Sequence, residues 1–138
     1  MIINLTQHPA TVSQRAAGVI DLYGSGLQQA KRLLSFDDLP TRAEIVDRAE
    51  RLAALAMLFA VSEDPEGDPK DPVAMIGGAP FLMAALEAAL VNIGIRPVYA
   101  FSTRDSVEET RADGSTQKTS VFNHAGFVNA VDTTWRAK

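Results

Sequence analysis

Two glycines, Gly77 and Gly78, separate a short apolar run, residues 73–76, from a segment that opens at Pro80. Pro80 suits the first turn of a helix, because the amide hydrogen that proline lacks would have no helical partner there. Two residues without side chains at a helix N-terminus let an anion approach the backbone amides. The turn therefore indicates an anion-binding site. The alternative is a tight turn that only packs a helix closely against a sheet.

The elements that position this turn form a strand–helix–strand unit. Residues 73–76 predict a buried strand, and residues 97–102 predict the next strand. The helix between them ends at Gly94 and carries a single charged residue, Glu87, so we expect it to be buried on most sides. Its apolar face comprises Leu82, Leu86, Ala89 and Ile93. A unit of this kind crosses over right-handed into a parallel sheet.

Polar residues follow three strands of this expected sheet. Met1–Leu5 predicts the first strand, and in an open parallel sheet ligands bind beyond the carboxyl ends of the strands. Amide, hydroxyl, imidazole and guanidinium groups at that edge would suit phosphate and nucleobase recognition. The candidate ligand-binding residues are Thr6, Gln7, Gly77, Gly78, Ala79, Pro80, Phe81, Ser102, Thr103 and Ser106, and the candidate catalytic residues are His8 and Arg104.

Each of these candidate side chains also has a purely structural interpretation. His8 can cap the helix that follows it, and Arg104 can pair with Asp105 on the surface. The serines near Arg104 can be turn residues, and His124 can be structural or can face the site. Phe81 belongs either to the core or to a surface on which a base stacks.

The N-terminal third of the chain predicts a second strand and short helices. Thr11 and Gln14 have the spacing of a capping box, which predicts a helix over about residues 12–17. The segments that follow are a strand at residues 19–22, a flexible Gly-Ser-Gly turn at residues 24–26 and a helix at residues 28–34.

The middle and the end of the chain complete one α/β domain over residues 1–138. Thr41 and Glu44 predict a second capping box, before a helix with apolar residues at Ile45, Ala49, Leu52, Ala56 and Phe59. The acidic, proline-rich residues 62–72 lack the spacing of an EF-hand and predict a surface loop. Residues 107–111 and 116–122 flank Asp113-Gly114 and predict a hairpin that projects or joins the sheet edge, and the last ten residues predict a tail.

Composition excludes several classes of protein. The 138 residues contain no cysteine, which removes disulfides and cysteine-ligated zinc and fits a cytoplasmic location. Thirteen basic residues against 17 acidic ones give a net charge of −4, so duplex nucleic acid is not an expected partner. No apolar run is long enough to cross a membrane. The motifs of Walker A NTPases, nucleophile-elbow esterases and dinucleotide oxidoreductases are also missing.

Residues 76–86, I-G-G-A-P-F-L-M-A-A-L, resemble the signature of CARF domains, the CRISPR-associated Rossmann fold. Residues 2–9, I-I-N-L-T-Q-H-P, are similar to the first strand and loop of small stand-alone CARF-like proteins. The resemblance implies a Rossmann-like homodimer that binds cyclic oligoadenylate, a short cyclic RNA, and a ring nuclease that cuts this messenger to switch off type III CRISPR antiviral signalling. Many CARF domains carry lysine where this chain has residues 79–81, Ala-Pro-Phe, so Arg104 or His8 would have to meet the phosphate charge.

The expected mechanism uses neither a metal nor another cofactor. The ligand's ribose 2′-OH would attack the adjacent phosphorus, with His8 as acid or base, residues 77–78 holding a phosphate and Arg104 stabilising the developing charge. Two other functions stay open. One is a sensor or sponge that binds the messenger without cleaving it, and the other is an enzyme that cleaves the N-glycosidic bond of a nucleotide, with Glu108 or Asp105 supplying the carboxylate.

The expected assembly is a homodimer. A cyclic oligonucleotide is too broad for the mouth of one small domain, and two copies around a two-fold axis would present paired Gly77–Gly78 turns and paired Arg104 side chains. Phe81, Met83 and the hairpin near Asp113 are the expected parts of the interface.

Overall fold

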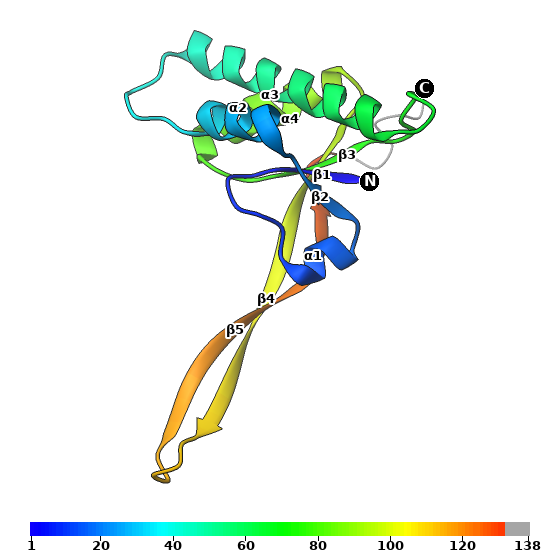
Figure 1. Cartoon of the computed structure of the whole chain (residues 1–138). Coiled ribbons are helices and arrows are strands. Elements are labelled where there is room, and N and C mark those ends of the chain that lie inside the picture. Colours follow the sequence, from blue (N-terminus) through cyan, green and yellow to red (C-terminus); the bar gives the residue numbers. More distant parts are fainter. Residues whose placement is uncertain (132–138) are drawn as a thin grey trace.

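A five-stranded sheet lies at the centre of the fold, with the strand order β2-β1-β3-β4-β5 (Figure 1). The computed structural model describes residues 1–131, so seven of the ten residues of the expected C-terminal tail lie outside the described residues. The strands are β1 (Ile2–Leu5), β2 (Val19–Asp21), β3 (Val73–Ile76), β4 (Arg96–Thr110) and β5 (Thr116–Asn129). β1 to β4 pair in parallel and β5 pairs antiparallel with β4. The predicted fold class, a mostly parallel sheet flanked by helices with a C-terminal hairpin, is confirmed.

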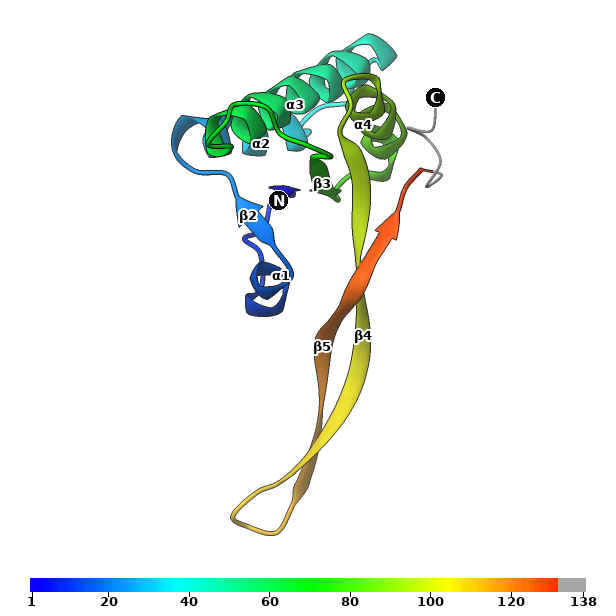
Figure 2. The same cartoon turned by 90° about the vertical axis from the view of Figure 1, so that its right-hand side faces the viewer.

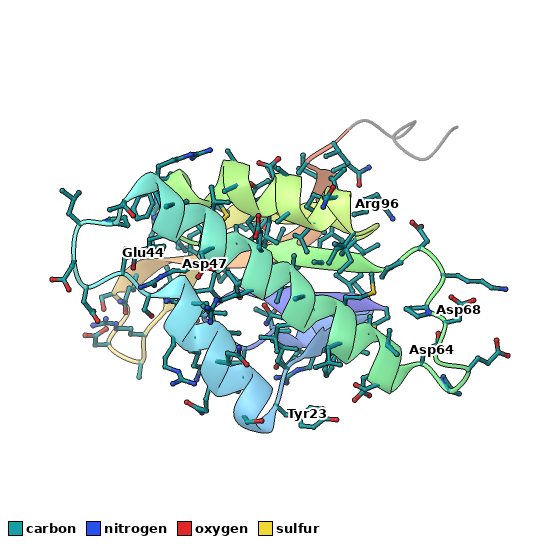
Figure 3. The ribbon with its side chains drawn as sticks, turned by 90° about the horizontal axis from the view of Figure 1, so that it is seen from above. Tyr23, Glu44, Asp47, Asp64, Asp68 and Arg96 are labelled. Carbon is teal, nitrogen blue, oxygen red and sulfur yellow. The ribbon has the colours of Figure 1, made fainter. Side chains whose placement is uncertain are left out.

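Three helices cover one face of the sheet and one short helix lies on the other. The helices are α1 (Val12–Ala16), α2 (Gly24–Leu34), α3 (Arg42–Glu63) and α4 (Pro80–Asn92). Figure 1 shows α2, α3 and α4 together above the sheet and α1 below it. Seen from above, these three helices lie side by side, with Glu44 near one end of the layer and Asp64, Asp68 and Arg96 near the other (Figure 3).

The main hydrophobic core lies between the sheet and the three-helix layer. The apolar positions predicted for α3 are buried, which confirms its helical pattern. The side chains that are wholly inaccessible to solvent include Ile3, Leu5, Leu52, Leu82, Leu86 and Leu90. A smaller cluster on the α1 side comprises Ala10, Val19, Val73, Met75 and Val98, with Phe127 packed against it.

Capping residues fix the starts of α1 and α3, as predicted. Thr11 and Gln14 form the complete reciprocal capping box of α1. The Thr41 hydroxyl accepts a hydrogen bond from the Glu44 amide, but the Glu44 carboxylate binds Arg48 at 2.9 Å, so the second box is only half formed. Because Arg48 also donates to backbone carbonyls in the last turn of α2 and to the Ser35 carbonyl just after it, it draws the carboxylate away from the cap.

Two predicted boundaries and one predicted burial pattern are wrong. The Gly-Ser-Gly segment at residues 24–26 is the first turn of α2, because burial of Ala30 and Leu34 against the core outweighs the low helix propensity of glycine. Helix α3 extends to Glu63, so the acidic loop begins two residues later than predicted. Helix α4 is buried on one side only, and Phe81, at its start, is 47% exposed.

The largest difference from the prediction concerns residues 103–106. They form no loop after a strand, since β4 runs without interruption to Thr110 and β5 pairs with it along its length. The hairpin therefore projects far beyond the sheet as a twisted two-stranded ribbon (Figures 1 and 2). We call residues 101–125 the arm.

Candidate functional site

A hollow of about 470 Å³ opens at the carboxyl ends of β1 and β3, next to the base of the arm. This volume lies within the range of small-molecule binding sites. Its lining residues are Thr6, Gln7, His8, Pro9, Thr11, Gln14, Met75, Ile76, Gly77, Gly78, Tyr99 and Ala100. The hollow thus lies where an open parallel sheet ordinarily binds its ligands.

The structure brings together only part of the predicted site. Thr6, Gln7, His8, Gly77 and Gly78 all line the hollow. Seven other candidates do not line it: Ala79, Pro80 and Phe81 in and before the first turn of α4, and Ser102, Thr103, Arg104 and Ser106 on the arm.

Arg104 lies outside the hollow because β4 carries it away from the body of the fold. Ala100 is the last β4 residue that lines the hollow. At about 3.3 Å per strand residue, Arg104 is about 13 Å farther along the ribbon. Its guanidinium carbon lies 5.8 Å from the centre of the Phe122 ring, a cation–π contact across the two strands.

The β1–α1 loop is held by a buried polar residue that the sequence analysis did not single out. Asn4, 5% exposed, donates from Nδ2 to the His8 carbonyl and to Asp21 Oδ1, both at 2.8 Å. Its Oδ1 accepts from the Thr6 amide at 2.9 Å and from the Thr6 hydroxyl at 2.7 Å. Three of these bonds fix the loop that forms one wall of the hollow, and the fourth ties Asn4 to Asp21. The signal in the sequence is a single polar residue inside an otherwise apolar strand.

Asp21 at the end of β2 completes this network. Its carboxylate also accepts from the Ala10 amide at 3.0 Å and pairs with Arg15 at 3.1 Å. Burial raises the pKa of Asp21, but the hydrogen bonds from Asn4 and Ala10 and the charge of Arg15 outweigh it, so the pKa lies below its ordinary value. The ionised carboxylate therefore stabilises the loop.

The glycine turn between β3 and α4 presents bare backbone at the hollow. Gly78 has φ +144°, a conformation that residues with side chains rarely adopt. Gly77 is unstrained, and a Cβ there would stand 3.5 Å from Thr6 Cγ2 at the edge of the hollow. Ala79, the N-cap of α4, supplies no side-chain cap. The helix start is thus left without a side-chain acceptor of its own.

The remaining polar side chains of the hollow differ in how firmly they are held. Tyr99 donates its hydroxyl to Glu87 at 3.2 Å, and burial together with this carboxylate raises the pKa of Tyr99 to about 12. Gln7 donates to the Ser35 hydroxyl at 2.8 Å and is turned toward the end of α2. His8 is exposed, and within residues 1–131 no hydrogen bond holds its imidazole. Of these three side chains, His8 is the one that can turn toward a ligand.

The hollow has few ionisable side chains on its walls. None of its described lining residues is Lys, Arg, Asp or Glu. A smaller hollow of about 100 Å³ adjoins it through Thr6, Gln7, His8 and Pro9, and this one is lined by Asp21 and Lys31. Over residues 1–131, no group of three His, Cys, Asp or Glu side chains is placed to hold a metal ion.

A comparison with protein families identifies the family of the chain. The family model described as "Uncharacterized protein MJ1673 family" matches residues 1–128. The chain belongs to the MJ1673 family. Searches among curated proteins and among solved structures gave no match. The description of the MJ1673 family names no activity, and no helix over residues 1–131 is long and apolar enough to span a membrane.

Proposed function

We propose that this protein binds cyclic oligoadenylate at the hollow and cleaves it without a metal, as a cytoplasmic ring nuclease that switches off type III CRISPR signalling. The observation that carries the proposal is that a bare backbone turn, Gly77–Gly78, and an unrestrained imidazole, His8, line the same hollow. Such a turn suits a phosphate, and an imidazole beside it suits proton transfer at neutral pH. The resemblance of residues 76–86 to the CARF signature supports the identity of the ligand.

The chemistry is an intramolecular phosphoryl transfer. His8 takes the proton of the ribose 2′-OH while that oxygen attacks the adjacent phosphorus. The bond from phosphorus to the 5′ oxygen breaks, and the 5′ oxygen takes up a proton. The products are a 2′,3′-cyclic phosphate and a free 5′-OH, so no water is consumed. The amides of the glycine turn hold the phosphate in line and stabilise its developing charge.

Turnover in the presence of EDTA tests this proposal. We expect excess protein to convert cyclic oligoadenylate into linear products ending in a 2′,3′-cyclic phosphate, resolved by chromatography. His8→Ala should slow cleavage by about 10² to 10⁴, the usual contribution of a general acid or base, while binding stays close to that of the wild type. Intact ligand after long incubation with several ring sizes would refute the nuclease proposal.

A matched pair of glycine substitutions tests the hollow as the place where the ligand binds. Gly77→Ala adds a methyl group at the hollow without backbone strain, and we expect calorimetry to show weaker binding. Gly26→Ala adds the same group inside α2, where its Cβ would lie 3.7 Å from Leu55 Cδ1. This control should bind like the wild type. Equal affinities for Gly77→Ala and the wild type would exclude the turn from the binding site.

A sensor or sponge that binds the messenger without cleaving it is the second candidate. The observation that favours it is the absence of Lys and Arg from the described lining of the hollow, since a cation commonly stabilises the transition state of phosphoryl transfer. Tight binding without turnover, at protein concentrations above that of the ligand, would select this function.

The structure gives less support to a nucleotide N-glycosidase. The two carboxylates considered for that reaction, Asp105 and Glu108, are both on the arm, and neither lines the hollow. Release of free adenine from nucleotides would show that the protein has this activity.

A further inference from the structure

The arm is a long element that its own chain leaves uncovered. Every residue from 101 to 118 is exposed, and Figures 1 and 2 show the ribbon extending clear of the helices and of the rest of the sheet. Its hydrophobic side chains are exposed as well, with Phe122 at 70% and Phe101 at 55%. A two-stranded ribbon without a covered face is marginally stable in water. The arm therefore has the properties of an element that is completed by a partner.

The total surface of the chain points to the same conclusion. It amounts to 8588 Å², whereas a compact monomer of 14.8 kDa exposes about 7,000 Å². Residues 132–138 can account for at most about 1,250 Å² of the excess, which is the surface of an extended chain of that composition. The described residues alone thus expose several hundred Å² more than a compact fold requires. A standard protein interface buries about 800 Å² per partner.

The charge of the arm favours a second copy of the same chain as that partner. Three basic residues, Arg104, Arg111 and Lys118, stand against four acidic ones, Asp105, Glu108, Glu109 and Asp113. Two identical surfaces can meet around a two-fold axis when each is nearly neutral and carries both signs. Nucleic acid would instead require a clear excess of positive charge.

One face of the arm continues the wall of the hollow. Residues at alternate positions of β4 share a face, so Ala100, which lines the hollow, shares its face with Arg104. Across the ribbon, Phe127 pairs with Ala100, and Phe122 pairs with Arg104. We call this the hollow-side face. The adjacent Val121, opposite Asp105, lies on the other face.

We propose that the arms of two copies pack together through their hollow-side faces around a two-fold axis, so that each arm crosses the open side of the other copy's hollow. From residue 101 to residue 110 the arm spans about 30 Å, roughly the width of a small domain. Arg104 and Phe122 are thereby delivered to the partner's hollow, which contains no cation of its own among the described residues. This last step rests on the proposed function. The packing of the arms does not.

Sedimentation equilibrium of the full chain without ligand tests the packing. We expect the wild type to have twice the mass of 14.8 kDa. Phe122→Lys should weaken the dimer by at least about tenfold, since aromatic residues dominate such interfaces. The neighbouring Val121→Lys, on the opposite face, should remain dimeric. The proposal would be overturned by a wild type that is monomeric at about 100 µM. It would also be overturned by a dimer that Phe122→Lys leaves intact.

Cross-linking gives an independent measurement. The chain contains no cysteine, so each single-cysteine variant has one reactive thiol. Ser106, paired with Ser120, shares the face of Arg104, and Ser106→Cys should give a covalent dimer with a short bis-maleimide. Ser25→Cys, in the first turn of α2 on the helix-covered side of the sheet, is the control and should stay monomeric on denaturing gels. Equal cross-linking of both variants would contradict the arm interface.

Neither sedimentation nor cross-linking measures activity. The arm proposal and the nuclease proposal can therefore fail separately.

Discussion

The body of the fold and the arm use the same strand pairing, yet they are stabilised in different ways. In the body, side chains such as Ile3 and Leu86 are wholly buried between the sheet and the helices. In the arm, the backbone ladder between β4 and β5 continues for many residues while most of the side chains remain exposed. Backbone pairing therefore sets the shape of the arm without the support of a buried face. A strand ladder can thus extend well beyond the hydrophobic core.

Polar contacts also differ between the two regions, because they are buried in the body and exposed in the arm. In the body, Asn4 is buried and makes four hydrogen bonds, three of which position the loop at the hollow. In the arm, Asn123 donates to Asp105 across the ribbon, but both residues are exposed to water. Water competes for an exposed bond, so the same residue type has a large structural effect in one place and a small one in the other.

Truncating a buried leucine should have the largest effect on stability. Leu86→Ala removes a fully buried side chain and leaves a cavity, so we expect a loss of about 2–5 kcal/mol in the free energy of unfolding. Val107→Ala, at a 40% exposed position on the arm, should cost less than about 0.5 kcal/mol. Urea denaturation of both variants measures the difference. Similar losses would show that the arm is packed as tightly as the body.

Removing one asparagine from each region sharpens the comparison. Asn4→Ala removes four hydrogen bonds from part-buried groups, and we expect a loss of about 1–3 kcal/mol together with weaker ligand binding. Asn123→Ala is the matched control, and its stability should stay within about 0.5 kcal/mol of the wild type. Urea denaturation reads out stability, and calorimetry reads out binding. If the two substitutions cost the same, Asn4 would not be the residue that organises the loop.

Acid should weaken the body through Asp21. Its pKa is lower in the folded protein than the value of about 3.9 in an unfolded chain, so its contribution to stability is present above about pH 4. That contribution is lost as the pH falls through the lowered pKa. Asp21→Asn should be less stable at neutral pH and should lose less stability between pH 5 and pH 3. The measurement is the urea midpoint of each protein as a function of pH. If the midpoint falls equally with pH in the variant and in the wild type, Asp21 does not have this role.

Much of the body could be predicted from the sequence because burial and helix starts leave local patterns. The apolar spacing of α3 reflects one buried face, and the apolar run of β3 reflects burial on both faces. The proline at the start of α4 reflects the free first turn of a helix. The start of α2 at Gly24 could not be predicted, since it depends on tertiary packing that outweighs local propensity.

The length of the arm and the position of Arg104 could not be predicted for a related reason. Residues 102–106, S-T-R-D-S, show no apolar alternation, because neither face of the ribbon is buried in its own chain. Their polar character therefore indicated a loop. The two parts of the hollow formed by Thr6–His8 and by Gly77–Gly78 were predicted from strand topology alone.

Mixing two inactive variants tests most directly whether the hollow of one copy and the arm of the other form a single site. His8→Ala removes the imidazole from the hollow, and Arg104→Ala removes the guanidinium from the arm. After equal amounts are mixed and allowed to exchange, about half the dimers should contain one chain of each kind, as expected for random pairing of identical interfaces. Each mixed dimer would regain one intact site of two. We predict about a quarter of the wild-type cleavage rate in the mixture, whereas a rate no higher than that of the separate variants would contradict a site shared between copies.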